Sequence, residues 1–157
     1  MYQKIKDLLN SNSINFREVH HEPAKTSQES ARARGEDISI GGKALVLKIE
    51  DSFKIFVLSA AKKLDSAAIK KRFNIKRLRF ANRDELLELT GLEPGSIPPF
   101  GQPLFDLELF VDNSIVQNKK IAFNAGTHTD SIIMSVKDYL ELTKPTIFNF
   151  SKQFDRK

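Results

Sequence analysis

Two neighbouring segments dense in β-branched and aromatic residues constrain the fold more than any other feature of this sequence. Residues 44–49 read ALVLKI, residues 53–58 read FKIFVL, and the three residues between them are polar. Short apolar runs that flank a polar turn are typical of an antiparallel hairpin. Both runs are far shorter than the roughly 20 apolar residues that a membrane-spanning helix needs, as is every other apolar run in the chain. The sequence therefore predicts a hairpin at the centre of a soluble protein.

Helices are expected on both sides of the hairpin. Thr26, Asp65 and Asn82 can each cap a helix, because their side-chain oxygens can accept an amide hydrogen bond in the first turn that follows. The first helix carries charges throughout, which distinguishes it from a signal peptide and favours a cytoplasmic location. The expected helices cover residues 2–9, 26–34, 65–73, the stretch that follows Asn82, and 137–142.

Strands outnumber helices in this pattern and follow one another mostly through short turns. The expected strands cover residues 15–19, 44–49, 53–58, 76–80, 106–111, 120–123 and 131–136. We find neither an internal repeat nor a linker, and 157 residues suit one hydrophobic core. The predicted fold class is therefore α+β: a compact single domain over residues 1–157, with a mixed, largely antiparallel central sheet flanked by helices.

Several kinds of catalytic site are excluded by what the chain lacks. There is no cysteine, so a thiolate nucleophile, a thiolate metal site and a disulfide are all ruled out. Two of the three histidines, His20 and His21, are adjacent, which is a poor arrangement for a metal cage, and we expect neither to be catalytic. The phosphate-binding, dinucleotide-binding, serine-esterase and zinc-protease signatures are absent too. We expect no metal and no cofactor.

The charge distribution is uneven and has two interpretations. Residues 62–83 contain nine lysines and arginines against one acid, Asp65, whereas residues 84–143 contain ten acids against three lysines. A basic block on a folded domain is the electrostatic footprint of a nucleic-acid binder. A solvated helix face would have the same composition, and the count alone does not distinguish the two.

Two segments carry the candidate chemistry. Lys43 follows two glycines at the entrance of the first hairpin strand, where its ammonium group could hold a phosphate; a lysine at a sheet edge is the plainer alternative. Residues 95–101 read GSIPPFG, a stiff loop whose glycines could turn amide N–H groups outward, as an oxyanion hole requires. The same loop could equally be a structural turn.

Four motifs in a fixed order resemble one family. They are His21-x-Pro23-x-x-Thr26, the glycine-flanked Lys43 before ALVLK, the loop GLEPGSIPPFG at residues 91–101, and FNAGTH at residues 123–128. Each motif is weak alone, but together they are similar to the YbaK/prolyl-tRNA synthetase-associated editing-domain family over residues 1–143.

This resemblance implies a hydrolase that removes a wrongly attached amino acid from tRNA in trans. The expected substrate is tRNA-Pro carrying alanine, cysteine or another small residue, and the expected fold is a compact α/β domain around a mixed sheet. Lys43 matches the family lysine that contacts a phosphate or ribose of the terminal adenosine. Gly95 to Pro99 match the loop that positions the ester, so Lys43, Gly95 and Pro99 are the expected catalytic residues. An aminoacyl ester is already activated, so oriented dipoles with a water or ribose hydroxyl could suffice without a metal.

The basic block, the local turn residues and the resemblance together indicate further residues. Lys70, Lys71 and Arg72 are expected to contact tRNA phosphates. The expected partners are the acceptor end of tRNA and prolyl-tRNA synthetase, with no membrane. Asp112 is expected to serve a turn. The expected substrate-binding residues are Thr26, Ser96, Gly101, Gly126 and His128, although Thr26 is also an adequate helix cap and His128 could be an ordinary loop residue.

Two alternatives remain at this level. A non-catalytic module of the same fold could bind tRNA or dock on a synthetase, but it would need only the basic block. A small-molecule binder unrelated to tRNA would leave the charge run of residues 62–83 unexplained. The presence of Lys43 together with an intact loop at residues 95–99 favours the enzyme.

Overall fold

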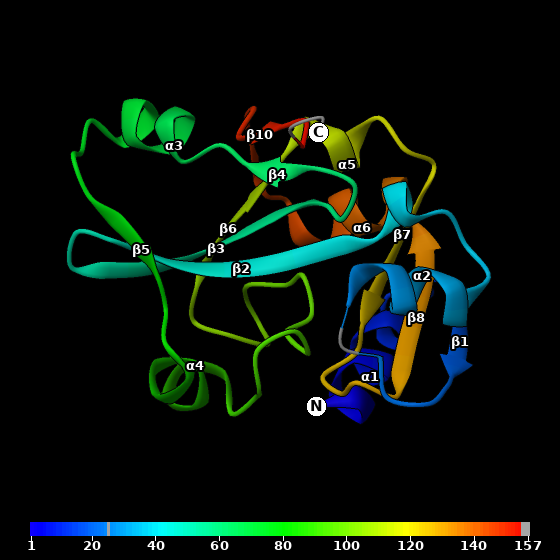
Figure 1. Cartoon of the computed structure of the whole chain (residues 1–157). Helices are drawn as coiled ribbons and strands as arrows, with labels where there is room; N and C mark the ends of the chain where they lie inside the picture. Colours follow the sequence, from blue (N-terminus) through cyan, green and yellow to red (C-terminus); the bar gives the residue numbers. More distant parts are fainter. Residues whose placement is uncertain (25, 155–157) are drawn as a thin grey trace.

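The predicted hairpin is the centre of the largest sheet. The computed structural model describes residues 1–24 and 26–154. Strands β2 (Gly42–Ile49) and β3 (Ser52–Ser59) pair along their full length in antiparallel register. β5 (Leu78–Phe80) pairs antiparallel with β2, while β6 (Glu108–Val111) pairs parallel with β3 and β9 (Thr146–Ile147) parallel with β6. The order β5-β2-β3-β6-β9 confirms a mixed central sheet (Figure 1).

The other strands form two smaller sheets. β1 (Phe16–His20), β8 (Asp130–Ser135) and β7 (Lys120–Asn124) make an antiparallel sheet in the order β1-β8-β7. β4 (Lys63–Leu64) and β10 (Ser151–Lys152) form an antiparallel pair. A single parallel bridge between Gly41 and Ala122 connects β7 to the segment that enters β2. The seven expected strands are thus divided between two sheets, and the β4–β10 pair adds a third that was not expected.

Helices cover both faces of the central sheet (Figure 1). Thr26, Asp65 and Asn82 cap helices as predicted, and Asn82 forms a complete capping box with Glu85. None of the helices in the described residues is long and apolar enough to cross a membrane. The helices are α1 (Tyr2–Ser11), α2 (Ser27–Arg34), α3 (Ser66–Phe73), α4 (Arg83–Thr90), α5 (Asn113–Val116) and α6 (Val136–Thr143), with a 3₁₀ turn η1 (Ile38–Ile40).

Alternating side chains of β2 reach two separate apolar clusters. Val46 belongs to a cluster that includes residues of α1, α6, β7, β8 and the loop before β6, whereas Leu47 belongs to one that includes residues of α3, β6 and the C-terminal segment. Successive strand residues point to opposite faces, so the two clusters lie on opposite sides of the sheet. The run of leucines in α4 predicts that Leu86, Leu87 and Leu89 all face the core, but Leu87 is 43% exposed. That prediction is wrong for Leu87, because one residue step rotates a side chain about 100° away from Leu86.

The C-terminal segment is held by one buried carboxylate. Asp112 is 1% exposed and caps α5 by accepting from the Ser114 amide at 2.9 Å, which confirms its predicted role in a turn. It also accepts from the Phe150 amide and the Ser151 hydroxyl, each at 2.6 Å. Phe150 itself is fully buried among the residues of the second cluster. Asp112 therefore fixes β10 against the central sheet.

Candidate active site

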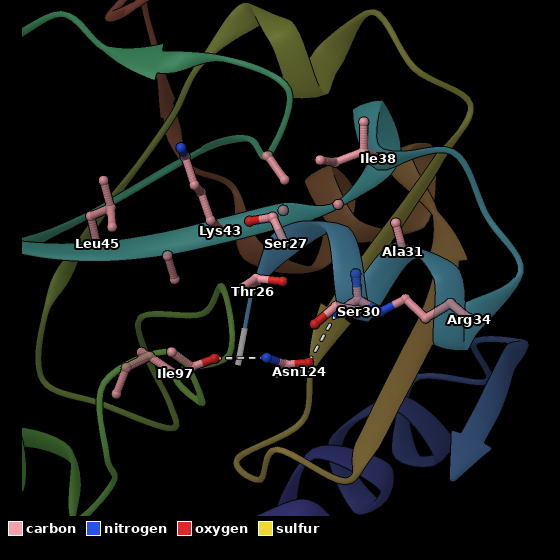
Figure 2. A pocket seen from close by; sticks show the side chains of 15 residues that line it. Thr26, Ser27, Ser30, Ala31, Arg34, Ile38, Lys43, Leu45, Ile97 and Asn124 are labelled. Carbon is pink, nitrogen blue, oxygen red and sulfur yellow. Dashed lines mark hydrogen bonds between the residues drawn. The ribbon is translucent and has the colours of Figure 1, made fainter. Parts of the chain in front are cut away.

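A small cavity of about 140 Å³ opens where β2 begins (Figure 2). Its wall is formed by α2 and its cap, by the entrance of β2, by the loop before β6, and by the end of β7. Small residues predominate near β2, where Gly41, Gly42, Ala44 and Ala60 all contribute. Such a cavity has room for a few water molecules or a compact side chain.

Three of the predicted site residues meet at this cavity. Thr26, Lys43 and Gly95 all line it, although they are far apart in the sequence. Thr26 does so while its hydroxyl accepts from the Glu29 amide at 3.1 Å, so it is both a helix cap and a lining residue. The structure therefore supports both of the roles that were considered for Thr26.

Lys43 supplies a half-buried cation beside the cavity. Its Nζ donates to the Lys62 carbonyl at 2.7 Å and lies 5.5 Å from the ring centroid of Phe154. Burial lowers the pKa of Lys43. No carboxylate of the described residues forms an ion pair with it. The ammonium group is thus positioned to bind an external anion.

Gly95 is the exposed residue of the predicted loop. Its φ of +85° lies in a region that side chains with a β-carbon rarely adopt. Its carbonyl accepts from Asn124 Nδ2 at 2.7 Å, while its own N–H has no acceptor among the residues that the structure describes. A β-carbon at this position would lie 3.2 Å from His128 Cε1. The loop therefore offers an unused backbone donor at the cavity wall.

Two lining residues that the sequence did not suggest hold this loop in place. Arg34 is 7% exposed, and its Nη2 donates to Asn124 Oδ1 at 3.0 Å. Because the arginine can only donate, Asn124 must direct its oxygen to Arg34 and its amide nitrogen to Gly95. Burial lowers the pKa of Arg34 to about 10. In the sequence, Arg34 reads only as a basic residue at the end of a helix.

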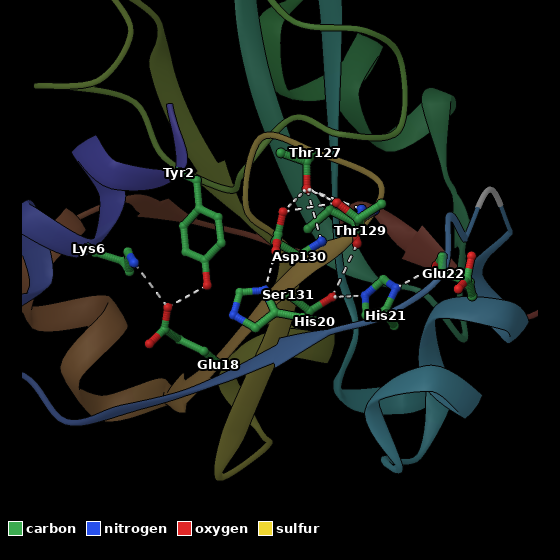
Figure 3. Close-up of polar contacts among 11 residues, drawn as sticks. Tyr2, Lys6, Glu18, His20, His21, Glu22, Thr127, Thr129, Asp130 and Ser131 are labelled. Atoms are coloured by element: carbon green, nitrogen blue, oxygen red, sulfur yellow. Dashed lines mark hydrogen bonds and ion pairs between the residues drawn. The ribbon is translucent and has the colours of Figure 1, made fainter.

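The network continues from Arg34 through Ser131 to His21, and Figure 3 shows the contact between the last two residues. Arg34 Nε donates to Ser131 Oγ at 3.0 Å, and Ser131 Oγ lies 3.0 Å from His21 Nε2. His21 Nδ1 lies 2.8 Å from the Glu22 carbonyl, which can only accept, so Nδ1 carries the proton. His21 therefore accepts from Ser131, whose side chain is fully buried. This arrangement supports a positional role for His21.

The turn at residues 127–130 is held by the carboxylate of Asp130. Asp130 Oδ2 accepts from the hydroxyls of Thr127 at 2.8 Å and Thr129 at 3.0 Å, and its other oxygen pairs with His20 (Figure 3). His128 lies in this turn, and its Nδ1 is buried without a hydrogen-bond partner in the described residues. The turn places the imidazole directly against Gly95.

The remaining predicted residues of the loop and turn lie outside the cavity lining. The Ser96 hydroxyl is buried and donates to the Glu93 carbonyl at 2.8 Å, and the Pro99 carbonyl accepts from Tyr139 at 2.6 Å. A β-carbon on Gly101 would lie 2.4 Å from the Leu107 carbonyl oxygen, and one on Gly126 would lie 2.7 Å from Met1. Gly95 thus lines the cavity, whereas the lining does not include Ser96, Pro99, Gly101, Gly126 or His128.

The predicted tRNA-binding residues lie on α3, away from the cavity lining. Lys70 lines an open depression of about 540 Å³ together with Lys48, Lys76, Arg77 and Arg79. Lys71 is exposed, and the Arg72 guanidinium lies 5.0 Å from the ring centroid of Phe148. Part of the basic block is neutralised, because Arg79 and Arg83 form ion pairs with Glu85 and Glu93. No cluster of three or more His, Asp or Glu side chains that could hold a metal occurs in residues 1–24 and 26–154.

The comparison with known families assigns this fold. A profile of the aminoacyl-tRNA editing domain family matches residues 21–142, and the chain belongs to that family. The match confirms the resemblance noted from the four motifs, and it spans every residue that lines the cavity.

Individual relatives agree with this assignment. The chain is 31% identical to the multifunctional Ser/Thr-tRNA deacylase ProXp-y of Escherichia coli (strain K12), over 96% of this chain and 93% of that protein. It is 33% identical to a segment of the proline–tRNA ligase of Shouchella clausii, which covers 66% of this chain and 18% of the ligase. A solved structure described as a proposed trans-editing enzyme for prolyl tRNA synthetase superposes with a TM-score of 0.84 at 22% identity, over 96% of both chains. That superposition confirms the fold.

Gly95→Ala and Ser96→Ala separate a backbone mechanism from a hydroxyl nucleophile. Gly95→Ala should slow the chemical step by about 10²–10³-fold while tRNA affinity changes little, because a β-carbon strains the positive φ and crowds His128. Ser96→Ala should retain most activity, because the Ser96 hydroxyl is already bonded to Glu93. Single-turnover deacylation measures both rates. An active Gly95→Ala beside an inactive Ser96→Ala would establish a serine-dependent esterase instead.

Asn124→Asp tests whether the orientation of the amide matters. The aspartate keeps the contact with Arg34 but places a carboxylate oxygen against the Gly95 carbonyl, so the loop should move and kcat should fall about tenfold or more. The stability of the fold should change less than kcat, which urea unfolding of the same variant will show. An Asn124→Asp protein with normal kcat would mean that this hydrogen bond does not position the loop.

Proposed function

We propose that this protein hydrolyses the ester bond of mischarged aminoacyl-tRNA in trans. The proposal rests on one observation: the unused Gly95 N–H and the Lys43 ammonium group belong to residues that line the same small cavity. The relative named as a Ser/Thr-tRNA deacylase, which this chain matches along almost its whole length, supports the same activity. A module that only bound tRNA would have no use for a backbone donor held so firmly.

The reaction needs one attacking oxygen and one stabilised oxyanion. A water molecule, which the neighbouring ribose hydroxyl can orient, attacks the carbonyl carbon of the ester, and charge develops on the carbonyl oxygen. The Gly95 N–H is the donor for that charge, and it is already fixed by the hydrogen bond from Asn124 to the Gly95 carbonyl. The bond to the ribose oxygen then breaks, that oxygen takes a proton, and the amino acid leaves. Since the ester is activated, orientation accounts for much of the rate.

Lys43 holds the other part of the substrate. Its ammonium group is fixed by the Lys62 carbonyl and has spare donors for a phosphate or ribose oxygen of the terminal nucleotide. In this arrangement the amino acid enters the cavity, and the nucleotide stays on the side of Lys43. Gly95 and Lys43 thus act on the ester and on its carrier respectively.

The cavity suits a small amino acid with a hydroxyl group. Its volume of about 140 Å³ limits the ligand to a short side chain, while Thr26 and Ser30 bring hydroxyl groups to the wall. Serine or threonine would fit this lining, in keeping with the substrates in the name of the E. coli relative. One methylene changes such discrimination by about 1–3 kcal/mol.

The finer identity of the tRNA is part of the same proposal. The similarity to segments of proline–tRNA ligases supports tRNA-Pro as the carrier, and it supports prolyl-tRNA synthetase as a partner from which the mischarged tRNA is taken. Comparing Ala-, Cys-, Ser- and Thr-charged tRNA-Pro with Ser-tRNA-Ser and Thr-tRNA-Thr resolves the amino acid and the tRNA separately.

Lys43→Ala tests the proposed function on that panel. Losing a charge-assisted contact should lower kcat/KM on the best substrate about 10- to 150-fold, while the fold persists because Lys43 is at the end of a strand. Lys62→Ala is a matched control, since it removes a neighbouring lysine but keeps the carbonyl that Lys43 uses. If no charged tRNA is hydrolysed faster than its spontaneous rate, the protein is a binding module. If Lys43→Ala equals Lys62→Ala, Lys43 is not part of the site.

Neutralising α3 tests the predicted tRNA contacts. Replacing Lys70, Lys71 and Arg72 by glutamine should weaken tRNA binding and lower the slope of log Kd against log salt by about two to three. The reason is that each phosphate that loses its protein contact keeps its counterion when the tRNA binds. The control replaces three exposed lysines elsewhere, Lys4, Lys119 and Lys137, with the same change in net charge. Equal slopes for the two triple variants would mean that α3 faces away from the tRNA.

A further inference from the structure

A second hollow adjoins the candidate active site on the other side of Lys43. It has a volume of about 330 Å³ and shares four lining residues with the first cavity, namely Ser27, Ile38, Lys43 and Ala60. The remaining wall includes Phe154, which lies beyond the residues matched by the family profile. The two hollows are therefore contiguous, with the Lys43 side chain between them.

Phe154 leaves an aromatic face open beside a cation. The residue is 54% exposed, and its ring centroid lies 5.5 Å from Lys43 Nζ. A single exposed aromatic residue is ordinary on a protein surface, but this ring lines a hollow that also contains a cation. Ala60 and Ala61 provide apolar surface next to the ring. A flat, apolar ligand with an anionic group would find partners for both of its parts here.

The position of Phe154 is set by anchored neighbours. Phe150 is buried, and Asp112 accepts hydrogen bonds from its amide and from the Ser151 hydroxyl. The Asp65 amide donates to the Phe150 carbonyl at 2.8 Å, and β10 pairs with β4 as far as Lys152. The chain is thus tied to the sheet two residues before Phe154. The anchored residues 150–152 thus determine where the chain reaches the hollow that Phe154 lines.

We propose that Phe154 is the stacking platform for the terminal base of the bound tRNA. The proposal rests on the proposed function, which places the ester in the first cavity and a phosphate or ribose oxygen at Lys43. The base attached to that ribose must then lie within a few ångströms of the Lys43 ammonium, and the second hollow is the adjoining space. Aromatic side chains next to a basic group are the recurrent means of binding an unpaired base. A hollow of this volume falls in the range of small-ligand pockets.

The proposal is tested with uncharged tRNA whose 3′-terminal adenine is replaced by 2-aminopurine. Stacking on an aromatic ring quenches the fluorescence of this base, so the readout does not depend on turnover. Wild-type protein and Phe154→Tyr should quench, whereas Phe154→Ala and Phe154→Leu should not. Phe80→Ala is the matched control, because Phe80 is 56% exposed but lies on β5, at the edge of the central sheet.

The kinetic prediction is a loss of binding with little change in chemistry. Phe154→Ala should raise KM for charged tRNA about 5- to 150-fold and leave kcat nearly unchanged, because a stacked base contributes equally to the ground state and the transition state. Quenching by Phe154→Ala equal to that by wild-type protein would overturn the proposal, as would normal quenching by Phe154→Leu. If wild-type protein quenches through Phe154 but hydrolyses no charged tRNA, the deacylase function fails and the stacking site stands.

Discussion

The close approach of β2 to β7 is the constraint on which the rest of this structure depends. The two sheets meet at a parallel bridge between Gly41 and Ala122, and a β-carbon on Gly42 would lie 2.7 Å from Ile121. A larger residue at position 42 would have to displace the Ile121 side chain, so glycine lets the strands come this near without rearrangement. The cavity forms where the sheets diverge from this contact, and Lys43 is the first side chain of β2 after it. Without the crossing there would be neither a cavity nor a place for the lysine.

The site relies on a fixed backbone more than on reactive side chains. Arg34 is buried without a carboxylate partner among the described residues, and burial lowers its pKa. Such a group is costly unless its donors are bonded, and Ser131 and Asn124 satisfy two of them. In return, the direction of the Asn124 amide is determined, and with it the position of the Gly95 carbonyl. The buried charge therefore orders a loop whose Gly95 lines the cavity.

Lys43 divides the site into two parts with different chemistry. On one side lie small residues and hydroxyl groups that suit a short amino-acid side chain, and on the other lies the exposed ring of Phe154. A mischarged tRNA has the same division, since a small amino acid is joined to a large flat nucleoside. Asp112 connects the second part to the core, because it caps α5 and holds Phe150 and Ser151. The same carboxylate thus stabilises the fold and fixes the segment that leads to the proposed base platform.

The sequence alone determined the hairpin and three helix caps, because each of these depends on residues close together in the chain, and it determined the family through four motifs in a fixed order. It also predicted that Lys43 and Gly95 belong to one site, and both line the cavity. It did not reveal Arg34 or Asn124, which are 90 residues apart and acquire a role only when α2 and β7 come together. It also did not reveal β4, β9 and β10, since two-residue strands have no periodicity and exist only through their partners. Nor could it separate Gly95, which lines the cavity, from Ser96, whose hydroxyl turns inward to Glu93. Those distinctions arise from the packing of the loop, which only the tertiary structure decides.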